Sequence, residues 1–186
     1  CALPICSYSI ASSPASALKG EYQITVKRIN DGFVSDYILD NWSVGDKVIA
    51  YAPEGNLIYN PLRDAKNIVG IAGGSGITPF LSLARAIDEG DEACSLTLLY
   101  GCRNSEEILF KDELDKLAEK NERINVVYVL SHSEEEGYEK GFVGADIIKK
   151  YANEDNYSIF VCGPGGLYKF LDTELPKLNK EKKYIF

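Results

Sequence analysis

The sequence has little of what a protein metal centre needs. It contains a single histidine, His132, which excludes a site built from several imidazoles. Its five cysteines are scattered and odd in number: Cys1, Cys6, Cys94, Cys102 and Cys162. No two of them are two residues apart, which excludes a local zinc knuckle or iron–sulfur loop. We therefore expect no metal site, and free thiols in a reducing, cytoplasmic compartment.

Basic residues and long apolar runs are also scarce. The 186 residues carry 20 Lys and Arg against 28 Asp and Glu, so the net charge is −8 and nucleic-acid binding is disfavoured. No apolar run approaches the roughly 18 residues that cross a bilayer, and no segment resembles a signal peptide. With 45% hydrophobic residues, the chain has enough apolar material for one large domain or two small ones.

The first third of the chain has the pattern of β-structure. In Glu21–Ile29, apolar Tyr22, Ile24 and Val26 alternate with polar residues, which is the period of a half-buried strand. Two further strands and one short helix are predicted here: Pro4–Ser13, Lys47–Ala52 and Val34–Asp40. We assign this part, residues 1–63, to a first domain.

From Asn67 onward, strands alternate with helices, and we assign residues 64–186 to a second domain. Four short apolar runs predict strands buried on both faces: Ile68–Ala72, Leu96–Tyr100, Ile124–Leu130 and Ile159–Cys162. One predicted helix begins near Pro79 and ends at Gly90. Three others cover Lys111–Lys120, Ala145–Tyr151 and Leu167–Leu178. This alternation predicts a doubly wound parallel sheet, to which Tyr184–Phe186 would add another strand.

A glycine-rich loop, Gly73-Gly74-Ser75-Gly76-Ile77-Thr78-Pro79, joins the first parallel strand to its helix. Glycines allow a ligand to approach the backbone, and the helix N-terminus offers unpaired N–H groups to a phosphate. The spacing differs from the usual dinucleotide fingerprint, and a simple tight turn is the alternative. The loop therefore indicates an anion or a nucleotide at this edge of the sheet.

Two other segments carry candidate residues. Cys162-Gly163-Pro164 follows the fourth strand, so it lies on the same edge of the sheet as the glycine loop, although a buried structural thiol is the alternative for Cys162. Near the N-terminus, Ser7–Pro14 is unusually rich in hydroxyl groups. Tyr8 and Ser9 would face opposite sides of a strand there, where they could contact the face and the edge of a ring; an exposed edge strand is the alternative.

Together and in this order, these segments resemble the ferredoxin–NADP reductase family, flavin-dependent NAD(P)H oxidoreductases. The resemblance implies a partial antiparallel flavin-binding β-barrel followed by a doubly wound NAD(P)-binding domain. It implies that Tyr8 packs on the FAD ring, and that Ser9 and Cys162 lie closest to the hydride transfer, as the catalytic residues. It places the FAD pyrophosphate on Gly32, Val34 and Ser35. The residues implied to hold NAD(P)H are Gly73, Gly74, Gly76, Thr78, Arg103, Cys162, Gly163 and Pro164.

The chain departs from the family pattern in its first domain. Cys6 stands where the family has an arginine, so Lys27 or Arg28 would have to supply the cation for the FAD pyrophosphate. Only three barrel strands are predicted, whereas the family barrel has six. We expect missing residues or a partner chain to complete the barrel, and the chain to be truncated at its C-terminus as well.

The resemblance implies hydride transfer from NAD(P)H to FAD and electron delivery to a ferredoxin, an iron–sulfur domain or a flavoprotein. The alternative is an electron-transfer subunit that binds a dinucleotide and works only with a partner chain. A nucleotide hydrolase is disfavoured because no nucleophile and base are arranged together.

Overall fold

The computed structural model describes residues 6–29, 31–152 and 156–178, and its centre is a five-stranded parallel sheet. The strand order is β4-β3-β2-β1-β5. The strands are β1 Asn67–Gly73, β2 Ser95–Cys102, β3 Ile124–Leu130, β4 Glu139–Lys140 and β5 Tyr157–Cys162. The chain runs outward from β1 to β4 and then returns to place β5 on the other side of β1. The carboxyl ends of β1 and β5 therefore form the switch point of the sheet.

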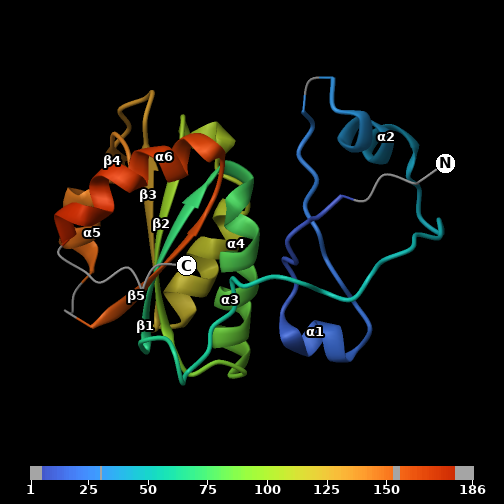
Figure 1. The fold of residues 1–186 in the computed structure, drawn as a ribbon, viewed down its shortest axis with the longest axis horizontal. Coiled ribbons are helices and arrows are strands. Elements are labelled where there is room, and N and C mark those ends of the chain that lie inside the picture. The colour runs from blue at the N-terminus through green and yellow to red at the C-terminus, as the bar shows by residue number, and fades with distance from the viewer. Residues whose placement is uncertain (1–5, 30, 153–155, 179–186) are drawn as a thin grey trace.

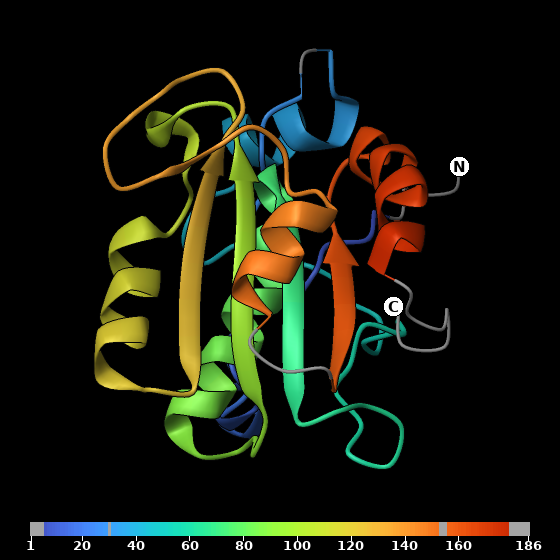
Figure 2. The same ribbon diagram turned by 90° about the vertical axis from the view of Figure 1, so that its left-hand side faces the viewer.

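Helices cover both faces of this sheet (Figures 1 and 2). One face carries α3 Thr78–Glu89 and α4 Lys111–Lys120, and the other carries α5 Ala145–Tyr151 and α6 Gly165–Glu174. Three short 3₁₀ helices complete this part: η1 Gly74–Ile77, η2 Ser105–Glu107 and η3 Leu175–Leu178. The doubly wound prediction and its helices are confirmed. The strand predicted over Tyr184–Phe186 lies outside the described residues.

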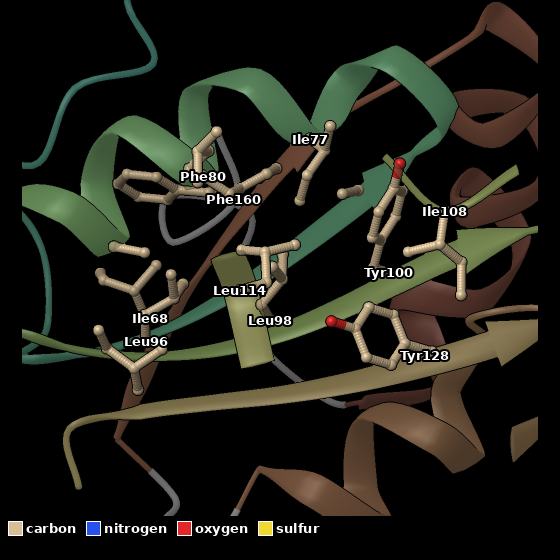
Figure 3. Packing of buried hydrophobic residues seen from close by; sticks show 14 of the residues in the cluster. Ile68, Ile77, Phe80, Leu96, Leu98, Tyr100, Ile108, Leu114, Tyr128 and Phe160 are labelled. Atoms are coloured by element: carbon tan, nitrogen blue, oxygen red, sulfur yellow. The ribbon is translucent and has the colours of Figure 1, made fainter. Parts of the chain in front are cut away.

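Two apolar clusters hold the layers together, one on each face of the sheet. The first packs β1 and β2 against α3 and α4, with Phe80, Leu98 and Leu114 fully buried (Figure 3). The second joins Val129 and Ile159 to α5 and α6. Because both faces are covered, the central strands are continuous apolar runs, as the sequence predicts.

Over the residues that the structure describes, none of the three strands predicted in the first third forms; the first two residues of Pro4–Ser13 lie outside them. In the described part of the region, the only β-pairing outside the named strands is a single antiparallel bridge between Ile10 and Ile24. A strand is stable only when its backbone groups pair with a neighbour over several residues, and no described segment offers that ladder. The helix predicted after Gly32 is confirmed as α2 Phe33–Asn41, and a short helix, α1 Pro14–Leu18, was not predicted.

Residues 11–13 attach the N-terminal region to α3. Ala11 is fully buried in the first apolar cluster, and its carbonyl accepts a hydrogen bond from Arg85 Nη1 at 2.7 Å. The Ser12 carbonyl accepts from Ser82 Oγ at 2.7 Å. Arg85 also binds both carboxylate oxygens of Glu113, at 2.7 and 2.9 Å. The arginine thus links the N-terminal region to both helices on this face of the sheet.

Two buried thiols lead us to predict a loss of stability at alkaline pH. Burial raises the pKa of Cys94 and Cys102 from 9.0 to about 11. The unfolded chain therefore loses these protons first, so the stabilisation is complete below pH 9 and is lost as the pH rises toward 11. We expect the free energy of unfolding, measured by urea denaturation, to fall by roughly 2 kcal/mol per thiol over this range.

Buried tyrosines change stability in the same direction, so the control is a double variant, Cys94→Ala with Cys102→Ala. It should lose a smaller part of its stability between pH 9 and 11 than the parent chain. Equal losses in the two proteins would contradict the prediction.

Candidate functional site

Two glycine-rich loops meet at the switch point of the sheet. Gly73 is the last residue of β1, and Cys162 is the last residue of β5. Cys162 pairs with Ala72, the residue before Gly73. A Cβ atom built on Gly76 would lie 2.1 Å from the Cys162 carbonyl oxygen, and one built on Gly163 would lie 3.2 Å from the Gly73 Cα. The loops therefore touch backbone to backbone, which only glycine permits at position 76. The structure thus brings together two segments that the sequence predicts on one edge.

Gly74 lies beside this contact and faces open space. Its φ is +54°, in the left-handed region that favours glycine, and a built Cβ would meet no protein atom within 4 Å. This is a position where a ligand can approach the backbone closely.

Two helices begin at the same edge. Neither α3 nor α6 has a side chain that caps its N-terminus, since the N-cap residues are Ile77 and Pro164. Thr78 is buried and its hydroxyl donates to the Ser75 carbonyl at 3.2 Å. The first N–H groups of α6, and those of η1, which runs directly into α3, have no partner within their helices. Together with the helix dipoles, they make this edge favourable for phosphate.

Cys162 is half-buried, and burial raises the pKa of its thiol above 9.0. The thiol is therefore neutral at physiological pH. A neutral thiol beside an aromatic ring contributes packing and a weak hydrogen bond, not a nucleophilic thiolate.

Arg103 follows β2 at the same edge of the sheet and its side chain is exposed. Gly101 pairs with Gly73, the first residue of the glycine loop, and the arginine follows Gly101 by two residues. Its backbone carbonyl accepts from His132 N at 2.9 Å, so the main chain at this position is held by the segment after β3.

The candidate residues near the N-terminus lie outside the parallel sheet. Tyr8 is half-buried, and its pKa is raised, first by burial and then by Cys6. Ser9 is exposed. Both precede the buried Ala11, which is where this segment is attached to α3. The structure places them in irregular backbone instead of the predicted strand.

The start of α2 has the tight geometry expected from the sequence. A Cβ on Gly32 would lie 2.7 Å from the Ile29 carbonyl oxygen, a backbone atom that cannot move aside, so glycine is required there. The buried Ser35 hydroxyl accepts from Ile29 N and donates to the Gly32 carbonyl, both at 3.3 Å. Val34 is half-buried within the same first turn. This hydroxyl therefore holds the turn itself together.

Of the adjacent cations Lys27 and Arg28, Arg28 forms ion pairs with α2. The Arg28 guanidinium binds Asp36 at 3.0 Å and Asp40 at 2.6 Å, and its hydrogen bond to Asp40 holds the pKa of that carboxyl below 3.8. Lys27 is exposed. Burial raises the pKa of Cys102 on β2, and the positive charge of Lys27 partly offsets that rise. Lys27 is thus the better candidate to bind an anion.

Tyr100 contributes to the site although its place in the sequence did not indicate it. The side chain is fully buried on β2, and its hydroxyl donates to the Gly74 carbonyl at 2.9 Å. A signal was available, because a tyrosine inside an apolar strand needs a partner for its hydroxyl. What that partner is depends on the register between β1 and β2.

A parallel sheet with glycine-rich loops and two uncapped helices at its switch point defines a nucleotide-binding α/β domain. Residues 71–173, more than half of the chain, match the family described as "Oxidoreductase NAD-binding domain". The chain belongs to this family, and its relatives and structural neighbours are of the ferredoxin–NADP reductase type. The family suggested by the sequence motifs is thereby confirmed.

Three comparisons give the extent of the likeness. NADH-cytochrome b5 reductase 1 of Dictyostelium discoideum is 32% identical over 173 residues, covering 90% of this chain and 59% of that protein. The cytochrome b5 reductase domain of Ulva prolifera nitrate reductase has a TM-score of 0.70 at 28% identity, over 81% of this chain and 61% of that one. The flavohem-like FAD/NAD-binding domain of nitric oxide dioxygenase from Vibrio cholerae shares the fold, with a TM-score of 0.78 at 24% identity. The match covers 96% of this chain and 73% of that one.

The chain therefore spans about three fifths of the length of that Dictyostelium relative, and the flavin barrel is covered only in part. Within the described ranges, no helix is both long and apolar enough to cross a membrane.

Proposed function

We propose that this chain is the nucleotide-binding part of a flavin-dependent oxidoreductase that takes a hydride from NADH and delivers electrons to a carrier protein. The observation that carries the proposal is the backbone contact between the Gly73–Gly76 loop and Cys162–Gly163 at the switch point. NADH, not NADPH, is the proposed donor because similar proteins are named NADH-cytochrome b5 reductase and NADH nitrate reductase. The same names favour a heme protein as acceptor over a ferredoxin or a flavoprotein.

The residues at the edge of the sheet fit a nicotinamide nucleotide. Gly74 leaves open space for a close backbone approach, and the helix N-termini favour its phosphates. Gly73, Gly76, Gly163 and Pro164 shape the floor of this site. Thr78 fixes its loop, Arg103 supplies a cation at its rim, and Cys162 places a neutral thiol beside it.

The residues that precede β1 supply candidate contacts for the pyrophosphate and for the flavin ring of FAD. The start of α2, with Gly32, Val34 and Ser35, suits a pyrophosphate, and exposed Lys27 supplies a cation. Tyr8 and Ser9 are the proposed contacts of the flavin ring.

When bound, NADH supplies a hydride and FAD accepts it, and FAD can then release electrons one at a time. The contribution of this chain is geometric: it positions two rings and keeps an ionised side chain out of their contact. The neutral thiol of Cys162 meets that requirement.

The exposed apolar surface of residues 18–62 supports the proposal that a further polypeptide completes the barrel. Most of the exposed large apolar side chains of the described residues lie there, including Leu18, Val44 and Leu62. A surface of this kind marks a protein contact. The covering segment would consist either of further barrel residues or of a partner chain. We also propose that the protein is cytoplasmic.

The test is a titration of the protein expressed from its complete gene, beside the 186-residue chain. We expect the complete protein to bind FAD and its flavin absorbance to bleach when NADH is added without oxygen. A protein that never binds FAD at saturation would refute the flavin assignment. A colourless protein that binds NADH would instead support a dependent electron-transfer subunit, which Cys6 and the absence of a strand ladder in the described N-terminal residues favour.

A further inference from the structure

Tyr100 connects the core of the sheet to the glycine loop. Its hydroxyl donates to the Gly74 carbonyl at 2.9 Å and accepts from Leu109 N at 3.3 Å. The side chain is fully buried, so both bonds form away from water. One phenol thus joins the loop after β1 to the segment that leads from β2 into α4.

The hydrogen bond to Gly74 fixes the direction of a whole peptide group. The Gly74 carbonyl and the Ser75 N–H belong to one planar unit and point in opposite directions. Since the carbonyl is directed inward to Tyr100, the Ser75 N–H is directed outward. Ser75 itself is exposed and lies in the first turn of η1, where backbone N–H groups have no partner within the helix.

Within the loop, the Thr78 hydroxyl bonds the Ser75 carbonyl and leaves the preceding Gly74–Ser75 peptide to be held by a group outside the loop. Gly74 has no Cβ and lies at φ +54°, so its backbone can adopt several conformations at little cost. Rotation of the Gly74–Ser75 peptide would turn the carbonyl outward, where it would repel a phosphate or ribose oxygen. The buried phenol opposes this rotation, because it would leave the hydroxyl and the carbonyl without their bond.

We propose that Tyr100 is a positioning residue for the nucleotide: its hydroxyl holds the Gly74–Ser75 peptide so that the Ser75 N–H is presented to the bound NADH. This inference rests on the proposed function, since it concerns the same site. It adds a specific donor, the Ser75 amide, and the side chain that orients it.

The test compares two tyrosine variants that each lose one hydroxyl. Tyr100→Phe removes the bond to Gly74. Tyr128→Phe is the matched control, because Tyr128 lies on the next strand with its ring 6.2 Å from that of Tyr100, yet its hydroxyl donates to Asp115 Oδ1 at 2.7 Å and does not bond the loop. Figure 3 shows the two hydroxyls pointing in different directions.

We expect Tyr100→Phe to weaken NADH binding about tenfold, while Tyr128→Phe stays within about twofold of the parent. In the complete enzyme, Tyr100→Phe should raise KM for NADH with little change in kcat. In the unliganded chain, the ¹⁵N–¹H signal of Ser75 should shift and broaden in Tyr100→Phe and remain in place in Tyr128→Phe.

The two ways of failing are distinct. If the parent protein binds no NADH, the proposed function is wrong and the inference falls with it. If the parent binds NADH but Tyr100→Phe binds it equally well, or if both variants weaken binding equally, only the positioning role is overturned. An unchanged Ser75 signal in unliganded Tyr100→Phe would overturn that role without reference to any ligand.

Discussion

Replacing Gly76 by alanine is expected to lower the free energy of unfolding by about 3 kcal/mol, the upper part of the range for overpacked positions. The new Cβ would lie 2.1 Å from the Cys162 carbonyl oxygen and 2.7 Å from Gly163 N. These are backbone atoms at the end of β5, the edge strand that pairs with β1, so they cannot rotate away as a side chain can. The loops would have to separate, and the nucleotide site would open with them. Urea denaturation and an NADH titration measure the two effects.

Gly165→Ala is the matched control for this prediction. Gly165 follows the same Cys162–Pro164 loop at the start of α6, but a Cβ there meets no atom within 4 Å. We expect its stability to remain within about 0.5 kcal/mol of the parent chain, as at unstrained surface positions. If Gly76→Ala is as stable as Gly165→Ala, the close contact between the two loops is not present in solution.

Replacing Gly74 by valine is expected to weaken NADH binding by roughly 100-fold, equivalent to about 2.7 kcal/mol. No protein atom lies within 4 Å of a Cβ at this position, so the branched side chain would fill space that we assign to the nucleotide. The left-handed backbone also costs an L-residue about 1–2 kcal/mol in stability. Flavin binding by the complete protein should be unaffected. Isothermal titration with NADH and with FAD separates the two ligands.

The control must carry the same backbone strain without touching the site. Gly90 meets both conditions, since its φ is +85°, a built Cβ meets nothing within 4 Å, and it caps the opposite end of α3. Gly90→Val should therefore lose a similar amount of stability and keep full affinity for NADH. Equal affinities in the two valine variants would show that the nucleotide does not approach Gly74.

Local pattern was sufficient to predict most of the parallel sheet and its helices. The helix predicted over Lys111–Lys120 is observed with the same bounds, and α3 ends at the left-handed Gly90 as expected. Spacing alone did not reveal β4, because two residues carry no detectable period. Glu139 and Lys140 form a strand only because Val129 and Leu130 of β3 are available to pair with them.

The strands predicted before β1 failed for a related physical reason, the lack of a neighbouring strand to pair with. Glu21–Ile29 has the alternation of a strand, but Tyr22 and Ile29 are exposed, with 61% and 66% of their surface accessible. Alternation shows that one face of a segment would be buried in a sheet, and it does not supply the neighbouring strand. The helix α1 was missed although Ser13 and Pro14 form a recognisable helix start.

For the candidate site, the amino-acid pattern alone indicates which residue types stand at the ends of β1 and β5: glycines where backbones must approach, a cysteine, and two helix starts. These are local properties, encoded within a few residues of each strand. The contact of Gly76 with the Cys162 carbonyl and the bond from Tyr100 to Gly74 follow from the packed fold and from no local pattern. Both contacts join residues far apart in the chain, and they depend on strand order and register, which arise when the whole sheet packs.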